Sequence, residues 1–105
     1  MVAGPVRVID ADTIDVGAIR VRLHAIDAPE QDQICQTEHG VDFACGVWAS
    51  AQVVDRFGGA IARCVQTDTD RYGRVVAKCA VDGVDMGQEI VSNGWAFAYR
   101  RYGMD

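Results

Sequence analysis

The sequence predicts an α+β fold that is mainly β: a small barrel of short strands with helical cover. Half of its 105 residues are apolar, which suits one domain over residues 1–105 with a real core. Several short runs alternate between apolar and polar residues, and a turn-forming "DRYG" separates two further apolar runs. Many short strands with few helices favour a barrel over a parallel sheet.

Three strands are expected near residues 5–10, 13–16 and 19–26. The third has the clearest pattern, because Ile19, Val21 and Leu23 alternate with the polar residues Arg20, Arg22 and His24. Residues 27–45 contain proline and several acids without a sustained period, and so indicate a long surface loop.

Two helices follow from the apolar spacing and the end signals. The first is expected from Val47 to Phe57, with an apolar side made by Val47, Trp48, Ala51 and Val54, and it stops at Gly58-Gly59. The second is capped by Asp85, carries Met86 and Ile90 inward and ends at Gly94.

The four cysteines are expected to form two disulfides. Runs 61–65 and 75–81 form an antiparallel hairpin around "DRYG", and centring the pairing on residues 71 and 72 sets Cys64 opposite Cys79. Cys35 and Cys45 then pair by elimination; the alternative is four free buried thiols, which packing permits. Two bridges predict an oxidising compartment, and hence a secreted or periplasmic protein whose signal peptide is absent from this chain.

Composition and missing motifs narrow the function. The net charge of −5 argues against a general polyanion-binding surface, and no apolar run is long enough to cross a bilayer, so no membrane partner is expected. No catalytic serine elbow, phosphate-binding loop or zinc spacing is present.

What remains is carboxylates and arginines near strand ends: Asp10, Asp12, Asp27, Glu30, Arg22 and Arg74. Oxygen ligands without His or Cys select Ca²⁺ or Mg²⁺, and the guanidinium fork suits a phosphate. Together they suggest metal-assisted cleavage of a phosphodiester.

Four segments, in order, resemble the staphylococcal nuclease-like, or thermonuclease, family: "VIDADT" (8–13), "VRLHAIDAPE" (21–30), "DRYGR" (70–74) and "NGWAFAY" (93–99). The resemblance covers nearly the whole chain. It implies a five-stranded OB-fold barrel with two or three packed helices and a Ca²⁺-dependent nuclease site acting on DNA, RNA or both.

The resemblance also implies roles for single residues. Asp12 and Asp27 would be Ca²⁺ ligands, with the backbone carbonyl of Ala28 as a further ligand and Asp10 nearby. Glu30 would position or deprotonate the attacking water, and Arg22 and Arg74 would hold the phosphate. Tyr72, Tyr99 and Tyr102 would contact the nucleotide. Ala28 stands where the best-known member has threonine, which removes one hydroxyl.

Family members continue beyond the segment matching "AYRRYGMD" into a further helix, so the chain is expected to lack that C-terminal helix. It would then be a monomer with exposed core residues, or a homodimer in which a second copy covers them. Two other function classes stay open: a non-catalytic OB-fold module that binds nucleic acid or protein, and a disulfide-stapled extracellular interaction domain.

Overall fold

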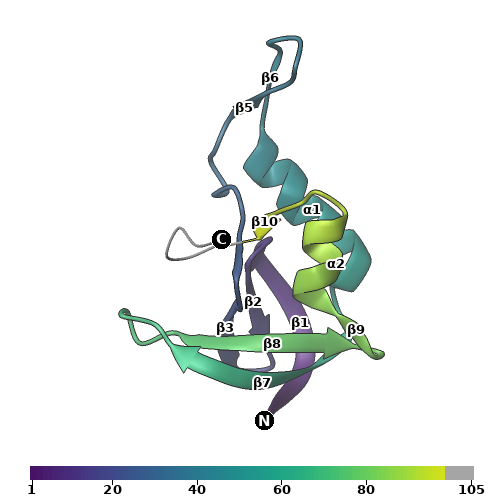
Figure 1. The fold of residues 1–105 in the computed structure, drawn as a ribbon. Helices are drawn as coiled ribbons and strands as arrows, with labels where there is room; N and C mark the ends of the chain where they lie inside the picture. The colour runs from purple at the N-terminus through teal and green to yellow at the C-terminus, as the bar shows by residue number, and fades with distance from the viewer. Residues whose placement is uncertain (99–105) are drawn as a thin grey trace.

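A computed structural model describes residues 1–98, and five of its strands close into a barrel (Figure 1). Neighbouring strands are antiparallel except for β3 and β8, which run parallel and complete the closure. This mainly β barrel with two helices confirms the predicted OB-fold-like class. The barrel strands are β1 (Val2–Asp10), β2 (Thr13–Val16), β3 (Ile19–Leu23), β7 (Ile61–Thr69) and β8 (Val75–Val81).

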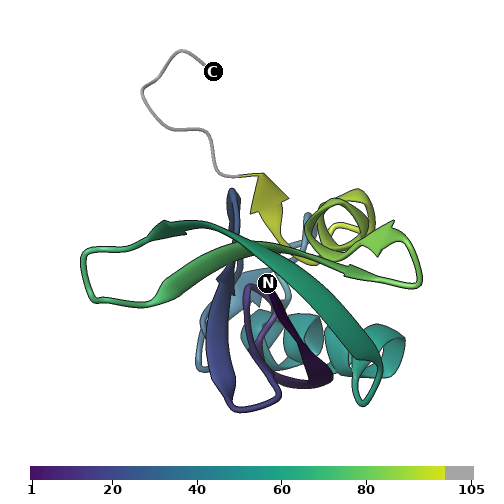
Figure 2. The same cartoon turned by 90° about the horizontal axis from the view of Figure 1, so that it is seen from below.

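Two helices cover the barrel, α1 (Cys45–Phe57) against β1 and α2 (Met86–Ser92) against β8 (Figures 1 and 2). Asp85 caps α2 as predicted, because its carboxylate accepts the Gln88 N–H at 2.9 Å, and Met86 and Ile90 are fully buried. No helix of the described residues is long and apolar enough to cross a membrane.

Five short strands lie outside the barrel wall. β9 (Val84–Asp85) extends the sheet beside β8, and β4 (Ile26–Asp27) pairs with β10 (Phe97–Ala98). Within the expected loop 27–45, β5 (Cys35–Gln36) and β6 (Asp42–Phe43) form a small hairpin that stands away from the barrel (Figure 1).

The third strand is shorter than the expected 19–26. It ends at Leu23, since Ala25 adopts the left-handed region with φ 61° and turns the chain before β4 begins. Val21 and Leu23 are buried as predicted, whereas Ile19 is partly exposed. Asp27 therefore lies in β4, which pairs with β10 outside the barrel wall.

The predicted apolar side of α1 is wrong. Val47, Trp48, Ala51 and Val54 are all exposed, and the buried face consists of Cys45, Gly46, Ala49, Ser50, Val53 and Phe57. Both faces carry apolar residues at helical spacing, so the spacing could not decide between them. Small residues on the buried face let the helix lie close to its neighbours.

The β7–β8 hairpin confirms the predicted pairing, with Cys64 opposite Cys79 and a disulfide joining them. Cys35 and Cys45 form the second disulfide, at the base of the β5–β6 hairpin. The register shifts by one residue between Gln66 and Asp68, which leaves Thr67 as a β-bulge. The bulge lies between the disulfide and the turn.

Candidate functional site

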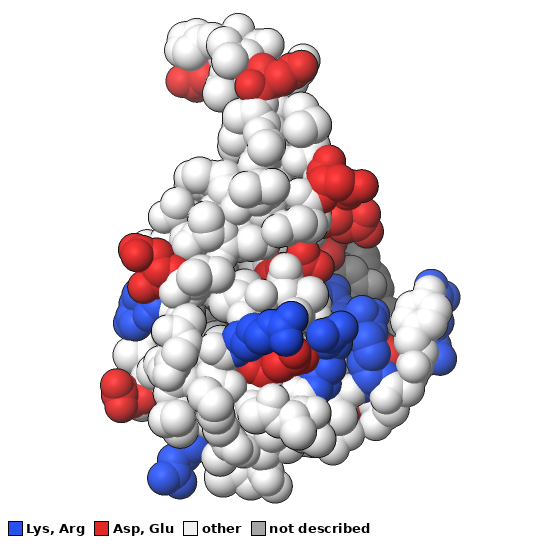
Figure 3. Space-filling model, turned by 180° about the vertical axis from the view of Figure 1, so that it is seen from behind, with Lys and Arg blue, Asp and Glu red and all other residues white. Residues whose placement is uncertain are grey.

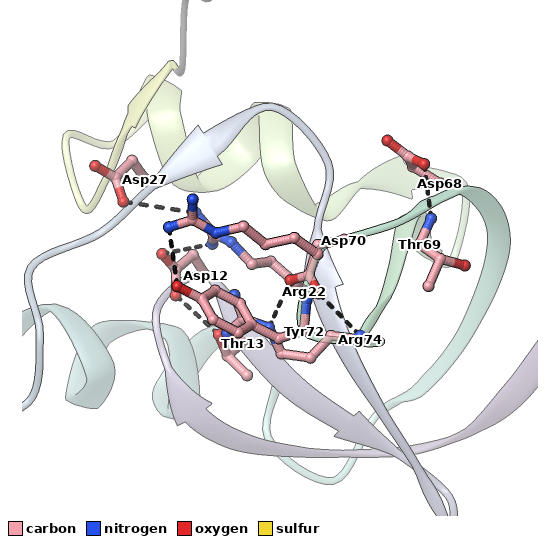
Figure 4. A network of polar contacts seen from close by, with 10 residues as sticks. Asp12, Thr13, Arg22, Asp27, Asp68, Thr69, Asp70, Tyr72 and Arg74 are labelled. Atoms are coloured by element: carbon pink, nitrogen blue, oxygen red, sulfur yellow. Dashed lines mark hydrogen bonds and ion pairs between the residues drawn. The ribbon is translucent and has the colours of Figure 1, made fainter.

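A groove of about 670 Å³ separates the β3–β4 segment from the β7–β8 turn. Figure 4 shows charged side chains from both walls pointing into this space. The groove therefore unites residues about fifty positions apart in the chain. Its polar lining residues are Arg22, His24, Asp27, Asp68, Thr69, Asp70, Arg71, Tyr72 and Arg74.

Asp12 is held by backbone and side-chain hydrogen bonds, and its side chain is mostly buried. It follows β1 in the tight turn to β2, where its carbonyl accepts the Leu23 N–H at 2.8 Å. Oδ1 accepts the Thr13 hydroxyl at 3.0 Å, and Oδ2 accepts the Ala28 N–H at 3.0 Å. The second bond fixes the Ala28 peptide beside this carboxylate.

Arg22 joins the two acids that the sequence singled out. Its Nη1 lies 2.8 Å from Oδ2 of Asp12, and its Nη2 lies 3.6 Å from Oδ1 of Asp27 (Figure 4). The pairing of Thr13 with Arg22 in the β2–β3 ladder brings the guanidinium to this position. Two carboxylates thus face one positive charge at the edge of the groove.

The opposite wall is a turn organised by Asp70. Its Oδ1 accepts the N–H groups of Tyr72 and Arg74, each at 2.9 Å, and its Oδ2 accepts Nε–H of Arg74 at 2.6 Å. Burial opposes ionisation, but these hydrogen bonds and the charge of Arg74 together lower the pKa of Asp70 below its ordinary value. Asp70 is therefore a charged clamp that orients Arg74.

Tyr72 presents an exposed ring flanked by two cations. The guanidinium of Arg71 lies 5.0 Å from the ring centroid and that of Arg74 lies 5.4 Å from it. Arg71 also donates a hydrogen bond of 2.9 Å to the Tyr72 hydroxyl. The turn thus offers an aromatic face and two guanidinium groups to a ligand in the groove.

A family model described as staphylococcal nuclease homologue matches residues 20–105. The chain belongs to the staphylococcal nuclease family. This agrees with the closed barrel and with the charged groove at one of its ends.

The chain is also similar in sequence to a curated protein, the succinoglycan biosynthesis protein ExoI of Rhizobium meliloti (strain 1021). Over 56 residues the two are 45% identical, which covers 53% of this chain and 29% of the relative. The matched part thus spans less than a third of the relative's length.

The nuclease family implies a Ca²⁺ ion, and the chemistry of the donors fits a hard cation. Asp12 and Asp27 supply carboxylate oxygens that already converge on the Arg22 cation, and the backbone N–H of Ala28 donates to Asp12. Among residues 1–98, no three His, Cys, Asp or Glu side chains lie close enough together to hold a metal ion. A metal ion held by these two acids would need backbone oxygens and water molecules as its remaining ligands.

Two further acids lie near Asp12. Burial and then the negative charges of Asp12, Glu30 and Asp32 raise the pKa of Asp10 above its ordinary value. Glu30 is exposed, and its backbone closes a turn with Gln33. Asp10 therefore lies within electrostatic reach of Asp12 and Glu30.

Of the predicted substrate-binding tyrosines, Tyr72 lies at the groove, and Tyr99 and Tyr102 lie outside the described residues. Figure 3 shows basic side chains gathered between the barrel and the β7–β8 turn, although the net charge of the chain is negative. Sequence reasoning gave no role to His24, whose Nδ1 lies 2.9 Å from the Thr67 hydroxyl. The bulge that sets Thr67 there left no pattern in the sequence.

Proposed function

We propose that this domain hydrolyses phosphodiester bonds of DNA or RNA and depends on Ca²⁺. The observation that carries the proposal is the shared groove, in which Arg22 and Asp27 face Arg74 and Tyr72 across a space open to a polymer. Membership in the staphylococcal nuclease family supports it.

The arginines bind the phosphate. Asp70 holds the Arg74 guanidinium and so orients it before the substrate arrives, whereas Arg22 pairs with Asp12 and Asp27, the two acids that would hold the metal. A planar fork can donate two hydrogen bonds to one phosphate, and Tyr72 packs against the sugar or base.

Asp12, Asp27 and the carbonyl of Ala28 would hold the metal, with Asp10 nearby. When bound, Ca²⁺ would supply positive charge that offsets the negative charge of the phosphate, and it would order water molecules around the ion. Hydrolysis needs such charge because the phosphodiester repels an incoming nucleophile.

Glu30 aligns a water molecule and accepts its proton as the water oxygen attacks phosphorus. The bond from phosphorus to the leaving oxygen breaks, and that oxygen leaves as a hydroxyl after taking a proton from solvent water. Glu30 then returns its proton to the solvent. Negative charge grows on the phosphate oxygens during the attack, and Arg22 and Arg74 stabilise it.

A non-catalytic binding module is the second candidate, favoured by one observation. Both arginines are already paired with acids, at 2.8 Å for Arg22 and 2.6 Å for Arg74. Ion pairs of this kind could serve the fold alone. The two candidates differ in whether the bound nucleic acid is cut.

Plasmid DNA and a folded RNA incubated with the protein in Ca²⁺, in Mg²⁺ or in chelator separate the candidates. We expect cleavage in Ca²⁺, little in Mg²⁺ and none in chelator. Arg22→Ala and Arg74→Ala should each lower kcat by about 10²-fold, because a transition-state contact is lost. Arg20→Ala is the matched control, since Arg20 lies on the same strand and pairs with Asp15 at 2.9 Å outside the groove. If the substrate stays intact in all three conditions, the nuclease proposal is refuted and the non-catalytic binding module is the candidate that remains.

We also propose that the protein is secreted or periplasmic. Two disulfides support this, because such bonds persist in oxidising compartments. Mass spectrometry of native protein alkylated without reduction should find no modified cysteine. Four alkylated cysteines in protein purified from an oxidising compartment would contradict it.

A further inference from the structure

We infer that Gly46, with Ser50, is a positioning residue for Glu30. The first turns of α1 form a surface against which the Glu30–Gln33 turn is fixed, and this contact surface of Gly46 and Ser50 is called the seat below. The inference rests on the proposed function for the role of Glu30 in the chemistry. The seat itself rests on contacts between described residues.

Gly46 lies inside the first turn of α1 and is buried against the backbone of the Glu30–Gln33 turn. A Cβ on Gly46 would overlap the carbonyl oxygen of Glu30 and lie 2.7 Å from its carbonyl carbon. It would also lie 2.9 Å from the carbonyl carbon of Gln31. Its backbone is helical, not left-handed, so glycine is required here for space.

Three further links attach the same turn to α1. The Gly46 N–H donates to the Gln33 carbonyl at 3.3 Å, and the buried Ser50 hydroxyl donates to Oε1 of Gln31 at 2.8 Å. The Cys35–Cys45 disulfide ties the following residues to the residue before Gly46. Every one of these links ends within five residues of Glu30.

The turn is also closed on itself, so its attachment fixes Glu30. The Gln33 N–H donates to the Glu30 carbonyl at 2.9 Å, and the Glu30 N–H donates to Oε1 of Gln33 at 3.2 Å. On its other side α1 is anchored in the core by Val53 and Phe57, both fully buried. Rigidity therefore passes from the barrel core through α1 to the backbone of Glu30.

The proton acceptor of a hydrolase must meet its water within a fraction of an ångström. A displacement of about 1 Å can cost about 10²-fold in rate. A methyl group at position 46 cannot be accommodated without moving the Glu30 carbonyl by a distance of that order. Binding of the phosphate by Arg22 and Arg74 does not involve this contact.

Gly46→Ala should therefore lower kcat by about 10- to 100-fold on a short single-stranded DNA while KM changes by less than about twofold. Glu30→Gln should lower kcat by at least as much. The double variant should be no slower than Glu30→Gln alone, because a positioning residue has nothing left to position. Ser50→Ala, which removes one hydrogen bond and no space, should show the same non-additivity with a smaller fall.

Gly4→Ala is the matched control. A Cβ there would lie 2.9 Å from the Gly17 backbone nitrogen, so it is also crowded, but it lies on β1 outside the groove lining. It should lower the melting temperature and leave kcat of the folded protein unchanged. Amide hydrogen exchange gives a readout without catalysis: Gly46→Ala should speed exchange of the Gln33 amide, and Gly4→Ala should not.

Wild-type kcat in Gly46→Ala, additive losses in the double variant, or unchanged Gln33 exchange would overturn the inference. If Gly46→Ala does not fold, the inference is tested instead by the kcat values of Ser50→Ala alone and combined with Glu30→Gln, and by hydrogen exchange of the Gln33 amide in Ser50→Ala. A Glu30→Gln variant with the wild-type rate would refute the proposed role of Glu30 instead. In that case faster Gln33 exchange in Gly46→Ala would still support the seat.

Discussion

Arg22 and a metal ion would compete for the same oxygens. Its Nη1 lies 2.8 Å from Oδ2 of Asp12, and its Nη2 lies 3.6 Å from Oδ1 of Asp27. A cation that binds these two acids must displace the guanidinium, which then becomes free to meet a phosphate. Metal binding and phosphate binding would thereby be coupled through one side chain.

Arg22→Ala should therefore bind Ca²⁺ more tightly, although it should hydrolyse substrate more slowly. The loss of the charged contact with Asp12, worth about 1.5–3 kcal/mol, predicts Ca²⁺ affinity higher by about tenfold or more. Isothermal titration calorimetry without substrate measures it, with Arg20→Ala as the control. Unchanged or weaker Ca²⁺ binding would show that Arg22 does not occupy the metal's place.

Asp70 gives the β7–β8 turn a pH dependence. Its folded pKa lies below its ordinary value of 3.8, so the ionised form stabilises the fold. That stability is present above pH 3.8 and is lost as the pH falls through the lowered pKa.

Asp70→Asn tests this, since an amide oxygen can still accept the Tyr72 and Arg74 N–H groups but carries no charge. The variant should melt at a lower temperature than wild type at pH 7, and the difference should shrink as the pH falls below 3.8. Thermal melts followed by circular dichroism measure it. Asp55→Asn, a change at an exposed position of α1, controls for general acid effects. A difference that is constant with pH would contradict the clamp.

At the scale of the element, two adjacent valines of α1 lie on opposite faces of the helix. Val53 is 0% exposed and lies in the core, whereas Val54 is 51% exposed. Val53→Ala should lower the free energy of unfolding by roughly 2 kcal/mol through lost burial and a cavity. Val54→Ala should change it by less than about 0.5 kcal/mol. Urea unfolding measures both, and equal losses would contradict the orientation of the helix.

The sequence predicted those elements whose signals were local. The Asp85 cap follows from neighbouring residues, and the β7–β8 hairpin follows from the turn between two apolar runs, although the Cys64–Cys79 register also depends on the bulge at Thr67. The buried face of α1 does not, because Val47, Trp48 and Val54 form as regular a stripe as Ala49, Val53 and Phe57. Only packing against β1 chooses between them.

The candidate site was predictable as a set of residue types and not as a geometry. Asp12, Asp27, Arg22 and Arg74 could be named because they lie near expected strand ends and in segments that resemble the staphylococcal nuclease family. The placement of Arg22 and Arg74 on opposite walls of one groove depends on how β3 meets β8, a contact between distant segments. The seat at Gly46 also needed the fold, since a glycine early in a helix has no distinctive pattern.

For the whole molecule, the charge distribution predicts a modest dependence of binding on salt. The net charge is −5, and three arginines line the groove: Arg22, Arg71 and Arg74. If these contact three phosphates of a single strand, the logarithm of affinity should fall against the logarithm of salt concentration with a slope of about −2. Fluorescence anisotropy with a labelled oligonucleotide measures it, and a slope of about −5 or steeper would require a second basic surface.

The bulge at Thr67 gives β7 one residue more than β8 between the disulfide and the turn that holds Arg74. The extra residue bends β7 and increases the twist of the hairpin at this point. Deleting Thr67 would leave Gln66 opposite Ala77 and Asp68 opposite Val76 in a regular ladder, with the disulfide and every other pair unchanged. The hairpin would lose its local bend, and with it the angle at which the turn brings Arg74 toward Arg22. In this stretch of β7, exchanging one residue for another keeps the bend, whereas removing one residue straightens the hairpin and changes the width of the groove.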